Sequence, residues 1–137
     1  MMKTLSYILL SVLLTSFGCK KKNLETNSSI EFALNKSQMV NSANVTVTNI
    51  NDNRCPPNAD CITAGKAEAQ LSVKVNGETK DLTLCIGGDC NKVGLSDQQT
   101  FSVASVNYTV KLVEVNPYNT FEKAVVPKTV KLQVTKM

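Results

Sequence analysis

The sequence predicts an all-β fold: an antiparallel β-sandwich, immunoglobulin-like or of another Greek-key type, with about seven strands. Apolar and polar residues alternate with a period of two in several segments between residues 30 and 137, as they do in half-buried strands. Turn-forming residues such as Asn76-Gly77 separate these segments. No segment past the N terminus has the apolar repeat of three to four residues that marks an amphipathic helix.

The first predicted strands alternate clearly. Apolar residues occupy every second position in the segment 30–34 and again in 45–48. The longest alternation is in 66–76, where the odd-numbered positions from Ala67 to Val75 are apolar and the even-numbered positions are polar. Each segment would bury one face and expose the other, as strands of an antiparallel sandwich do.

Asn76-Gly77 predicts a tight hairpin, because a type I′ turn needs a positive φ at both central residues. A two-residue turn here makes the apolar faces of the two strands coincide away from the turn, and a slip of one residue would destroy the match. Glu78 and Lys80 would oppose valines at the tip, where solvent can reach them. The predicted pairs are Val75 with Glu78, Val73 with Lys80, Leu71 with Leu82, Ala69 with Leu84 and Ala67 with Ile86.

The later strands follow the same rule. Phe101 and Val103 indicate a short strand, and the segment 106–112 alternates over its whole length. The apolar residues then change phase at 113–115, which predicts a β-bulge, and Pro117 ends that strand. The segment 130–135 alternates again and closes the chain.

Composition excludes several classes of function. The 137 residues contain no His and no Trp, which removes His-based catalysis and His metal ligands. The net charge of +4 arises from Lys3 and Lys20–Lys22, and the remaining chain has 11 basic and 11 acidic residues. Such a balance argues against nucleic acid as a partner. We predict no catalytic residue, no cofactor and no metal site.

The N terminus predicts export and a lipid anchor. Lys3 precedes an apolar stretch, Leu5–Phe17, that is too short to cross a bilayer. Gly18 before Cys19 resembles the bacterial lipobox, in which the Cys becomes the first mature residue and is acylated; an ordinary signal peptide with an incidental Cys is the alternative. The predicted divisions are a signal peptide (1–18), a lipid-anchored flexible linker (19–29) and a β-sandwich domain (30–137).

The residues around Cys19 also bear on location. Acyl chains at Cys19 would hold the protein to a membrane, and Lys20–Lys22 would lie against lipid head groups. No Asp follows Cys19, which by resemblance to known lipoprotein sorting favours the outer membrane. No acidic patch of the kind linked to surface export follows either, so we expect a periplasm-facing position.

Four cysteines remain: Cys55, Cys61, Cys85 and Cys90. An even number in an exported chain predicts two disulfides. Local pairing would close two small loops, which Pro56-Pro57 and Gly87-Gly88 help to bend. Pairing of Cys61 with Cys90 and of Cys55 with Cys85 stays open, because extending the hairpin brings these segments together. The spacings fit neither a zinc site nor a redox-active Cys-x-x-Cys pair.

The motif Asp52-Asn53-Arg54-Cys55-Pro56, followed by Cys61, Gly65 and Ala67, resembles that of small bacterial lipoproteins of the Bacteroidetes type. Their later Tyr-x-Val-x-Leu-x-x-Val-x-Pro pattern is similar to Tyr108–Pro117 here, whereas Thr63 stands where the group usually has Trp. The resemblance implies an exported lipoprotein without catalytic residues, and it supports local pairing of the cysteines.

These features predict a lipid-anchored cell-envelope protein, a non-catalytic structural or binding module whose partner is an envelope protein or a cell-wall component. The alternative is a protease inhibitor or adhesin that presents the Cys55–Cys61 loop, with Arg54, Pro56 and Pro57 as contacts. Asn and Asp residues in the loops offer oxygen ligands for Ca²⁺. They lack the spacing of a calcium loop, and they also serve turns without an ion.

Overall fold

The computed structural model describes residues 28–120 and 126–137. The predicted signal peptide, Cys19 and most of the predicted linker lie outside the described residues. Within the described residues, no helix is long and apolar enough to cross a membrane.

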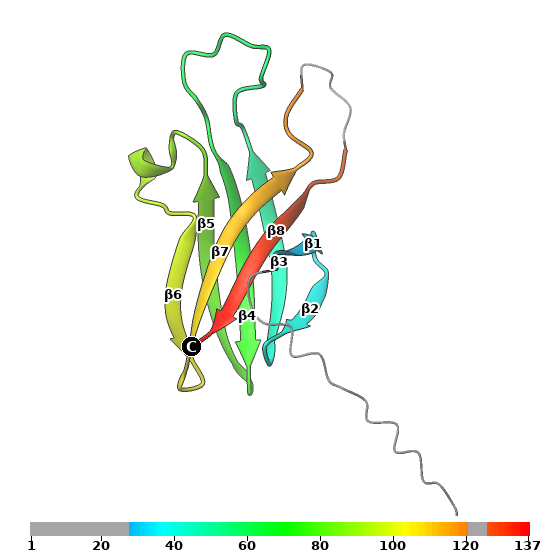
Figure 1. The fold of residues 1–137 in the computed structure, drawn as a ribbon, viewed down its shortest axis with the longest axis vertical. Helices are drawn as coiled ribbons and strands as arrows, with labels where there is room; N and C mark the ends of the chain where they lie inside the picture. Colours follow the sequence, from blue (N-terminus) through cyan, green and yellow to red (C-terminus); the bar gives the residue numbers. More distant parts are fainter. Residues whose placement is uncertain (1–27, 121–125) are drawn as a thin grey trace, which may run out of the picture.

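The described chain forms two antiparallel sheets of four strands each (Figure 1). This arrangement confirms the predicted all-β sandwich. One short 3₁₀ helix, η1 (Cys90–Val93), follows the fifth strand. The strands are β1 (Ile30–Ala33), β2 (Ser37–Val40), β3 (Ala43–Asp52), β4 (Ala67–Val75), β5 (Glu78–Ile86), β6 (Gln98–Val103), β7 (Val106–Asn116) and β8 (Thr129–Lys136).

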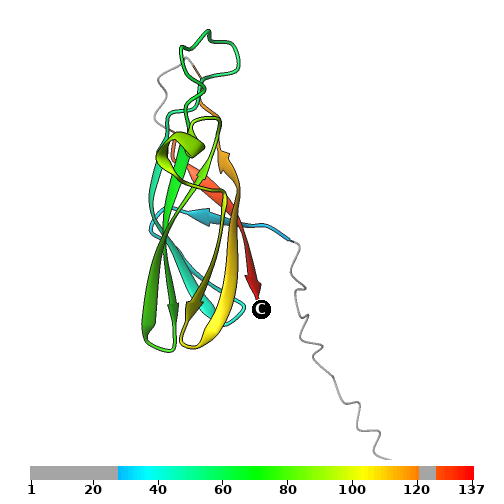
Figure 2. The same ribbon diagram turned by 90° about the vertical axis from the view of Figure 1, so that its left-hand side faces the viewer.

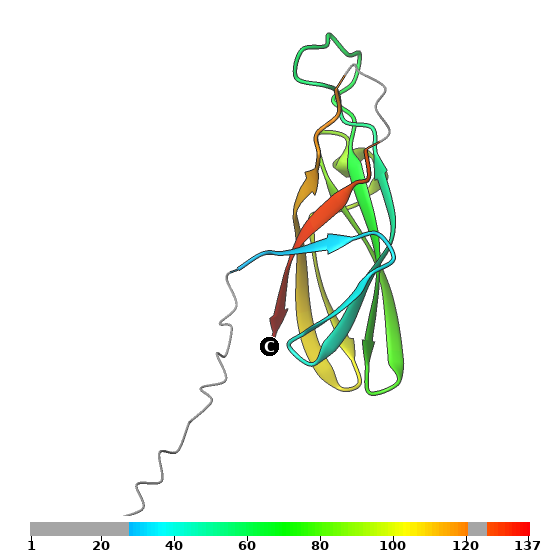
Figure 3. The same ribbon diagram turned by 90° about the vertical axis from the view of Figure 1, so that its right-hand side faces the viewer.

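The strand order is that of meanders. Sheet A has the order β1-β8-β7-β6 and sheet B the order β2-β3-β4-β5, so paired strands are consecutive in the chain except for β1 and β8. Figure 3 shows β1 leading across one side of the sandwich toward β2. A Greek key would return its fourth strand beside its first, so the finer expectation of a Greek-key or immunoglobulin-like order is corrected. The physical reason lies in the turns. Two-residue turns with positive φ, at Asn41-Ser42, Asn76-Gly77 and Ala104-Ser105, are so short that each strand must pair with the strand that follows it in the chain.

The predicted hairpin register is confirmed. Val75 pairs with Glu78 and Ala67 with Ile86, and each pair between them is the predicted one. Glu78 and Lys80 are exposed near the turn, as expected. The predicted bulge in β7 is also present, between Leu112 and Glu114.

Two features of the first strands were not predicted. The four-residue β2 adds an eighth strand, and β3 has a bulge between Val47 and Asn49. Sequence alternation grouped Leu34 with the buried Phe32, but Leu34 lies beyond β1 and is 44 % exposed. Short edge segments bury little apolar surface, so their pattern in the sequence is weak.

The core lies between the two sheets and draws on strands of both. Each large apolar side chain buried there stabilises the fold by about 1.5–3 kcal/mol. The Tyr108 hydroxyl donates to the carbonyl oxygen of Asn41 at 3.0 Å, which satisfies the polar end of a buried ring. The largest fully buried side chains are Tyr108, Phe32, Leu71, Leu84, Leu112 and Leu132.

Three connections gather at one end of the sandwich, at the top of Figures 1 and 2, while the tight hairpins lie at the opposite end. These connections are the β3–β4 connection (53–66), the β5–β6 connection (87–97) and the described parts of the β7–β8 connection (117–120 and 126–128). We call this the loop end. The predicted partner-binding residues and both cysteine pairs lie here.

Candidate functional site

A buried carboxylate lies at the loop end, where β3 finishes. The side chain of Asp52 is 1 % exposed, and its Oδ2 lies 2.8 Å from Nη2 of Arg54 and 2.8 Å from Nζ of Lys128. Nε of Arg54 donates to Oδ1 at 2.8 Å, so this pair is bidentate. Burial raises the pKa of the Asp52 carboxyl, but hydrogen bonds from Arg54 and Lys128 outweigh burial and lower the pKa overall.

The same cluster ties the β7–β8 connection to the end of β3. Nδ2 of Asn119 donates to the carbonyl oxygens of Asp52 at 3.2 Å and Arg54 at 2.9 Å. Nζ of Lys128 donates to the carbonyl oxygen of Pro117 at 2.6 Å and to Oδ1 of Asn119 at 2.8 Å. Within the described chain, no buried side-chain nitrogen or oxygen lacks a hydrogen-bond partner. The base of the loop end is therefore a satisfied polar network.

Arg54 was predicted as a contact for a partner, and the structure places its side chain within the base of the loop end. Arg54 is 7 % exposed, and its Nη2 also donates to the carbonyl oxygen of Val115 at 2.8 Å. Its guanidinium lies 4.0 Å from the ring centroid of Tyr118, a cation–π contact. The hydrogen bond to the Asp52 carboxylate, and the negative charge of that carboxylate, raise the pKa of Arg54, which stays charged. Arg54 therefore supports the loop from inside.

The first disulfide joins Cys55 to Cys61, as local pairing predicted. The loop base is closed by a hydrogen bond from the Cys55 N–H to the carbonyl oxygen of Ala64 at 2.9 Å. Inside the loop, the Ala59 N–H donates to the carbonyl oxygen of Pro56 at 3.1 Å, which forms a turn. Pro56 is half-buried and Pro57 is exposed. Of the predicted contacts, Pro57 is thus the one a partner could reach most easily.

Ile62 is the most exposed large apolar side chain at the loop end, with a relative exposure of 104 %. It follows the first disulfide directly, and Cys61 and Thr63 beside it are exposed as well. Sequence analysis did not single out Ile62, because a lone isoleucine in a loop has no pattern that separates exposure from burial.

The second disulfide joins Cys85 to Cys90, again as local pairing predicted, and both residues are buried. The adjoining Asp89 binds Gly65 of the β3–β4 connection, just after the Cys55–Cys61 loop. Its Oδ2 accepts from the Gly65 N–H at 2.9 Å, and its own N–H donates to the Gly65 carbonyl oxygen at 3.2 Å. Hydrogen bonds from Lys92 and then Gly65 lower the pKa of Asp89. The two cysteine loops are therefore joined to each other.

Gly65 is required where these loops meet. Its φ is +73°, and a Cβ at this position would lie 2.2 Å from the carbonyl oxygen of Asn53. Both the backbone conformation and the lack of space therefore select glycine. Gly65, Asp52 and Arg54 all serve to build the loop end.

The carboxylates considered for Ca²⁺ do not converge on one point. Asp52 is bound by Arg54 and Lys128, and Asp89 by Gly65 and Lys92. Within residues 28–120 and 126–137, no group of three or more His, Cys, Asp or Glu residues could hold a metal ion.

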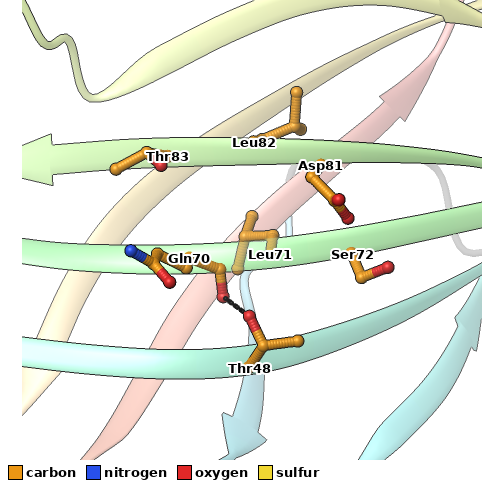
Figure 4. A pocket seen from close by; sticks show the side chains of 7 residues that line it. All are labelled: Thr48, Gln70, Leu71, Ser72, Asp81, Leu82 and Thr83. Atoms are coloured by element: carbon orange, nitrogen blue, oxygen red, sulfur yellow. Dashed lines mark hydrogen bonds between the residues drawn. The ribbon is translucent and has the colours of Figure 1, made fainter.

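A shallow polar hollow of about 380 Å³ lies on the outer face of sheet B (Figure 4). The Thr48 hydroxyl donates to the carbonyl oxygen of Gln70 at 3.2 Å, and Asp81 is the one charged residue among those that line the hollow. No aromatic ring is available there for stacking on a sugar or a base. The lining residues are Thr48, Gln70, Leu71, Ser72, Asp81, Leu82 and Thr83.

The loop end combines a buried charged base, two joined cysteine loops and an exposed apolar tip. Comparison with protein-family models, curated proteins and solved structures finds no match to the chain. The geometry of the loop end is therefore the basis for a proposal about function.

Proposed function

We propose that this protein is a non-catalytic binding module of the bacterial cell envelope, anchored by acyl chains at Cys19, whose Cys55–Cys61 loop contacts a protein partner. The observation that carries the proposal is the full exposure of Ile62 beside a loop whose base is fixed from two directions. A partner that buries an apolar side chain held out in this way gains the hydrophobic free energy of the surface removed from water.

Rigidity of the loop supports this role. A loop that is ordered before binding loses little conformational entropy when a partner binds. Here the first disulfide, the hydrogen bond between Cys55 and Ala64, and the contact of Gly65 with Asp89 each restrict the loop.

The buried base supports the same role. Arg54 connects the start of the loop to β7, while Asn119 connects it to the β7–β8 connection. These bonds fix the direction in which the loop projects from the sandwich, and so the position of Ile62 relative to the body.

A site-specific cross-linking experiment tests the loop contact. A photo-reactive amino acid replaces Ile62 in cells that make the full chain, and a matched variant carries it at Met39, which is 69 % exposed on β2. We expect a discrete cross-linked protein from position 62 and none from position 39. A protease as the cross-linked partner would select the inhibitor alternative, and a host or surface protein would select the adhesin. Equal products from both positions, or none from position 62, would contradict the loop contact.

The lipid anchor has its own test. Mass spectrometry of the N-terminal peptide from native protein should find Cys19 as the first residue, with a mass increase equal to its acyl chains. Cys19→Ser should release the protein from the membrane fraction, whereas the nearby Ser28→Ala should not. An unmodified Cys19 would contradict the anchor and leave the loop contact to be judged by the cross-linking result.

A further inference from the structure

Tyr118 is the one exposed aromatic residue in the part of the chain that the structure describes. The other three aromatic side chains there, Phe32, Phe101 and Tyr108, are buried in the core between the sheets. Tyr118 is 44 % exposed and lies at the loop end, in the β7–β8 connection. An aromatic ring removes a large apolar area from water when it is covered, so Tyr118 offers more binding surface than most exposed residues.

The position of the Tyr118 ring is fixed by the buried base of the loop end. The Arg54 guanidinium lies 4.0 Å from the ring centroid, and it is held in turn by Asp52 and by the carbonyl oxygen of Val115. The next residue, Asn119, donates to the carbonyl oxygens of Asp52 and Arg54. A ring that is already held against a cation loses little side-chain entropy when a partner covers its other side.

The hydroxyl group of Tyr118 is available to a partner. Among the described residues it has no hydrogen-bond partner, whereas the buried Tyr108 hydroxyl donates to the carbonyl oxygen of Asn41 at 3.0 Å. A tyrosine hydroxyl that becomes buried usually finds a partner of its own, because leaving it unpaired costs free energy. A protein that covers the Tyr118 ring must therefore also supply an acceptor oxygen.

Tyr118 shares the loop end with other exposed apolar side chains. Ile62 projects from the 53–66 connection with a relative exposure of 104 %, and Val126, also in the β7–β8 connection, is 50 % exposed. The two connections stand next to each other (Figures 1 and 3), and a hydrogen bond of 2.9 Å joins their bases. Single exposed apolar side chains are ordinary on a protein surface, but here three lie on two connections that are bonded together.

The charges of the loop end favour a protein as the occupant of this surface. Every described cation there is already paired with a carboxylate of the same chain, so none is left over for a phosphate group of nucleic acid or lipid. The centre of a protein–protein interface is typically poor in charged residues and rich in aromatic ones. The pairs are Arg54 and Lys128 with Asp52, Lys66 with Glu68, and Lys92 with Asp89.

We infer that Tyr118 anchors the partner: a folded protein covers the loop end, takes the Tyr118 ring into an apolar pocket and accepts a hydrogen bond from its hydroxyl. The inference rests on the proposed function, because it gives the partner of the Cys55–Cys61 loop a second point of attachment. Tyrosine is among the residues that most often dominate the binding free energy of an interface. The partner therefore contacts both connections, and not the Cys55–Cys61 loop alone.

Photo-cross-linking in cells that make the full chain tests the anchor directly. A photo-reactive derivative of phenylalanine replaces Tyr118, so an aromatic ring stays over Arg54. A matched variant carries the same derivative at Val113, which is also 44 % exposed. We expect position 118 to give the same cross-linked protein as position 62, and position 113 to give none.

Substitutions measured through the cross-linker at position 62 separate anchoring from support of the fold. Tyr118→Ala should lower the yield of cross-linked partner at least about tenfold. Tyr118→Phe keeps the ring over Arg54 and removes only the hydroxyl, so it should lower the yield about threefold. Val113→Ala is the control and should change the yield less than about twofold. If Tyr118→Ala fails to fold, Tyr118→Phe and the cross-link from position 118 decide the result.

The outcomes distinguish this inference from the loop contact. A product from position 62 with none from position 118 would overturn the anchor and leave the loop contact in place. A product from position 118 with none from position 62 would support Tyr118 as a binding residue and contradict the loop contact. Equal products from positions 113 and 118, or a yield that Tyr118→Phe leaves unchanged, would also overturn the anchor.

Discussion

Asp52 and Arg54 stand two residues apart at the end of β3, and two hydrogen bonds of 2.8 Å join their side chains where water hardly reaches. Removing one member of a buried ion pair leaves its partner uncompensated, at a cost of about 3–5 kcal/mol. We expect Asp52→Asn to lower the free energy of unfolding by about 3 kcal/mol, the lower end of that range, because Lys128 keeps 24 % exposure. Urea unfolding of the purified variant measures the change.

Asp97→Asn is the matched control for that measurement. Asp97 pairs with Lys111 at 3.8 Å, and both side chains are largely in water. An exposed pair of this kind contributes about 0–1 kcal/mol. Equal losses in the two variants would show that the buried cluster has no special part in stability.

Asp52 also makes stability depend on pH. Its pKa in the folded protein lies below the ordinary value of 3.8. The stability it contributes is therefore present above that value and is lost as the pH falls through the folded pKa. We expect the stability difference between the wild type and Asp52→Asn to be constant near neutral pH and to shrink as the pH falls below about 4.

Taking the difference between the two proteins removes the effect of other carboxyls. Hydrogen bonds from Lys92 and Lys131 lower the pKa values of Asp89 and Glu114, so the wild type alone would mix several titrations. A stability difference that stays the same down to acid unfolding would contradict the assignment to Asp52.

The β4–β5 register could be predicted from the sequence, because a turn signal at Asn76-Gly77 and the apolar faces of both strands agree on one pairing. The base of the loop end could be predicted only in part. Asp52 and Arg54 are close in the chain and of opposite charge, but Lys128 lies 76 residues from Asp52. No local pattern indicates that the β7–β8 connection folds back onto β3, so Arg54 looked available to a partner.

Two glycines with positive φ give a test of packing at the loop end. Gly65 has a φ of +73° and a Cβ there would meet backbone at 2.2 Å, whereas Gly77 has a φ of +83° and nothing within 4 Å. Gly77→Ala should lower the free energy of unfolding by about 1–2 kcal/mol, because alanine is strained in the left-handed backbone conformation. Gly65→Ala should lower the free energy of unfolding clearly more, because the added Cβ would also force the backbone of the 53–66 connection to move. Thermal unfolding of both variants measures this, and equal costs would show that the loop gives way freely.

The two disulfides should differ in their reaction with a reductant. Cys61 is exposed, while Cys85 and Cys90 are 1 % and 6 % exposed. A thiolate must reach a sulfur atom to exchange with it, so dithiothreitol under native conditions should reduce Cys55–Cys61 first, by a factor of at least about ten in rate. Timed alkylation followed by peptide mass spectrometry measures both rates.

Reduction of the first disulfide should release the loop without unfolding the sandwich. Closing a loop this small stabilises the fold by about 2 kcal/mol, and the loop lies outside the core between the sheets. The free energy of unfolding should therefore fall by about that amount, while the amide signals of β4 and β5 stay in place. If both disulfides react together and at the rate of global unfolding, the loop is not independently accessible, and a partner would not find Ile62 presented on a separate rigid element.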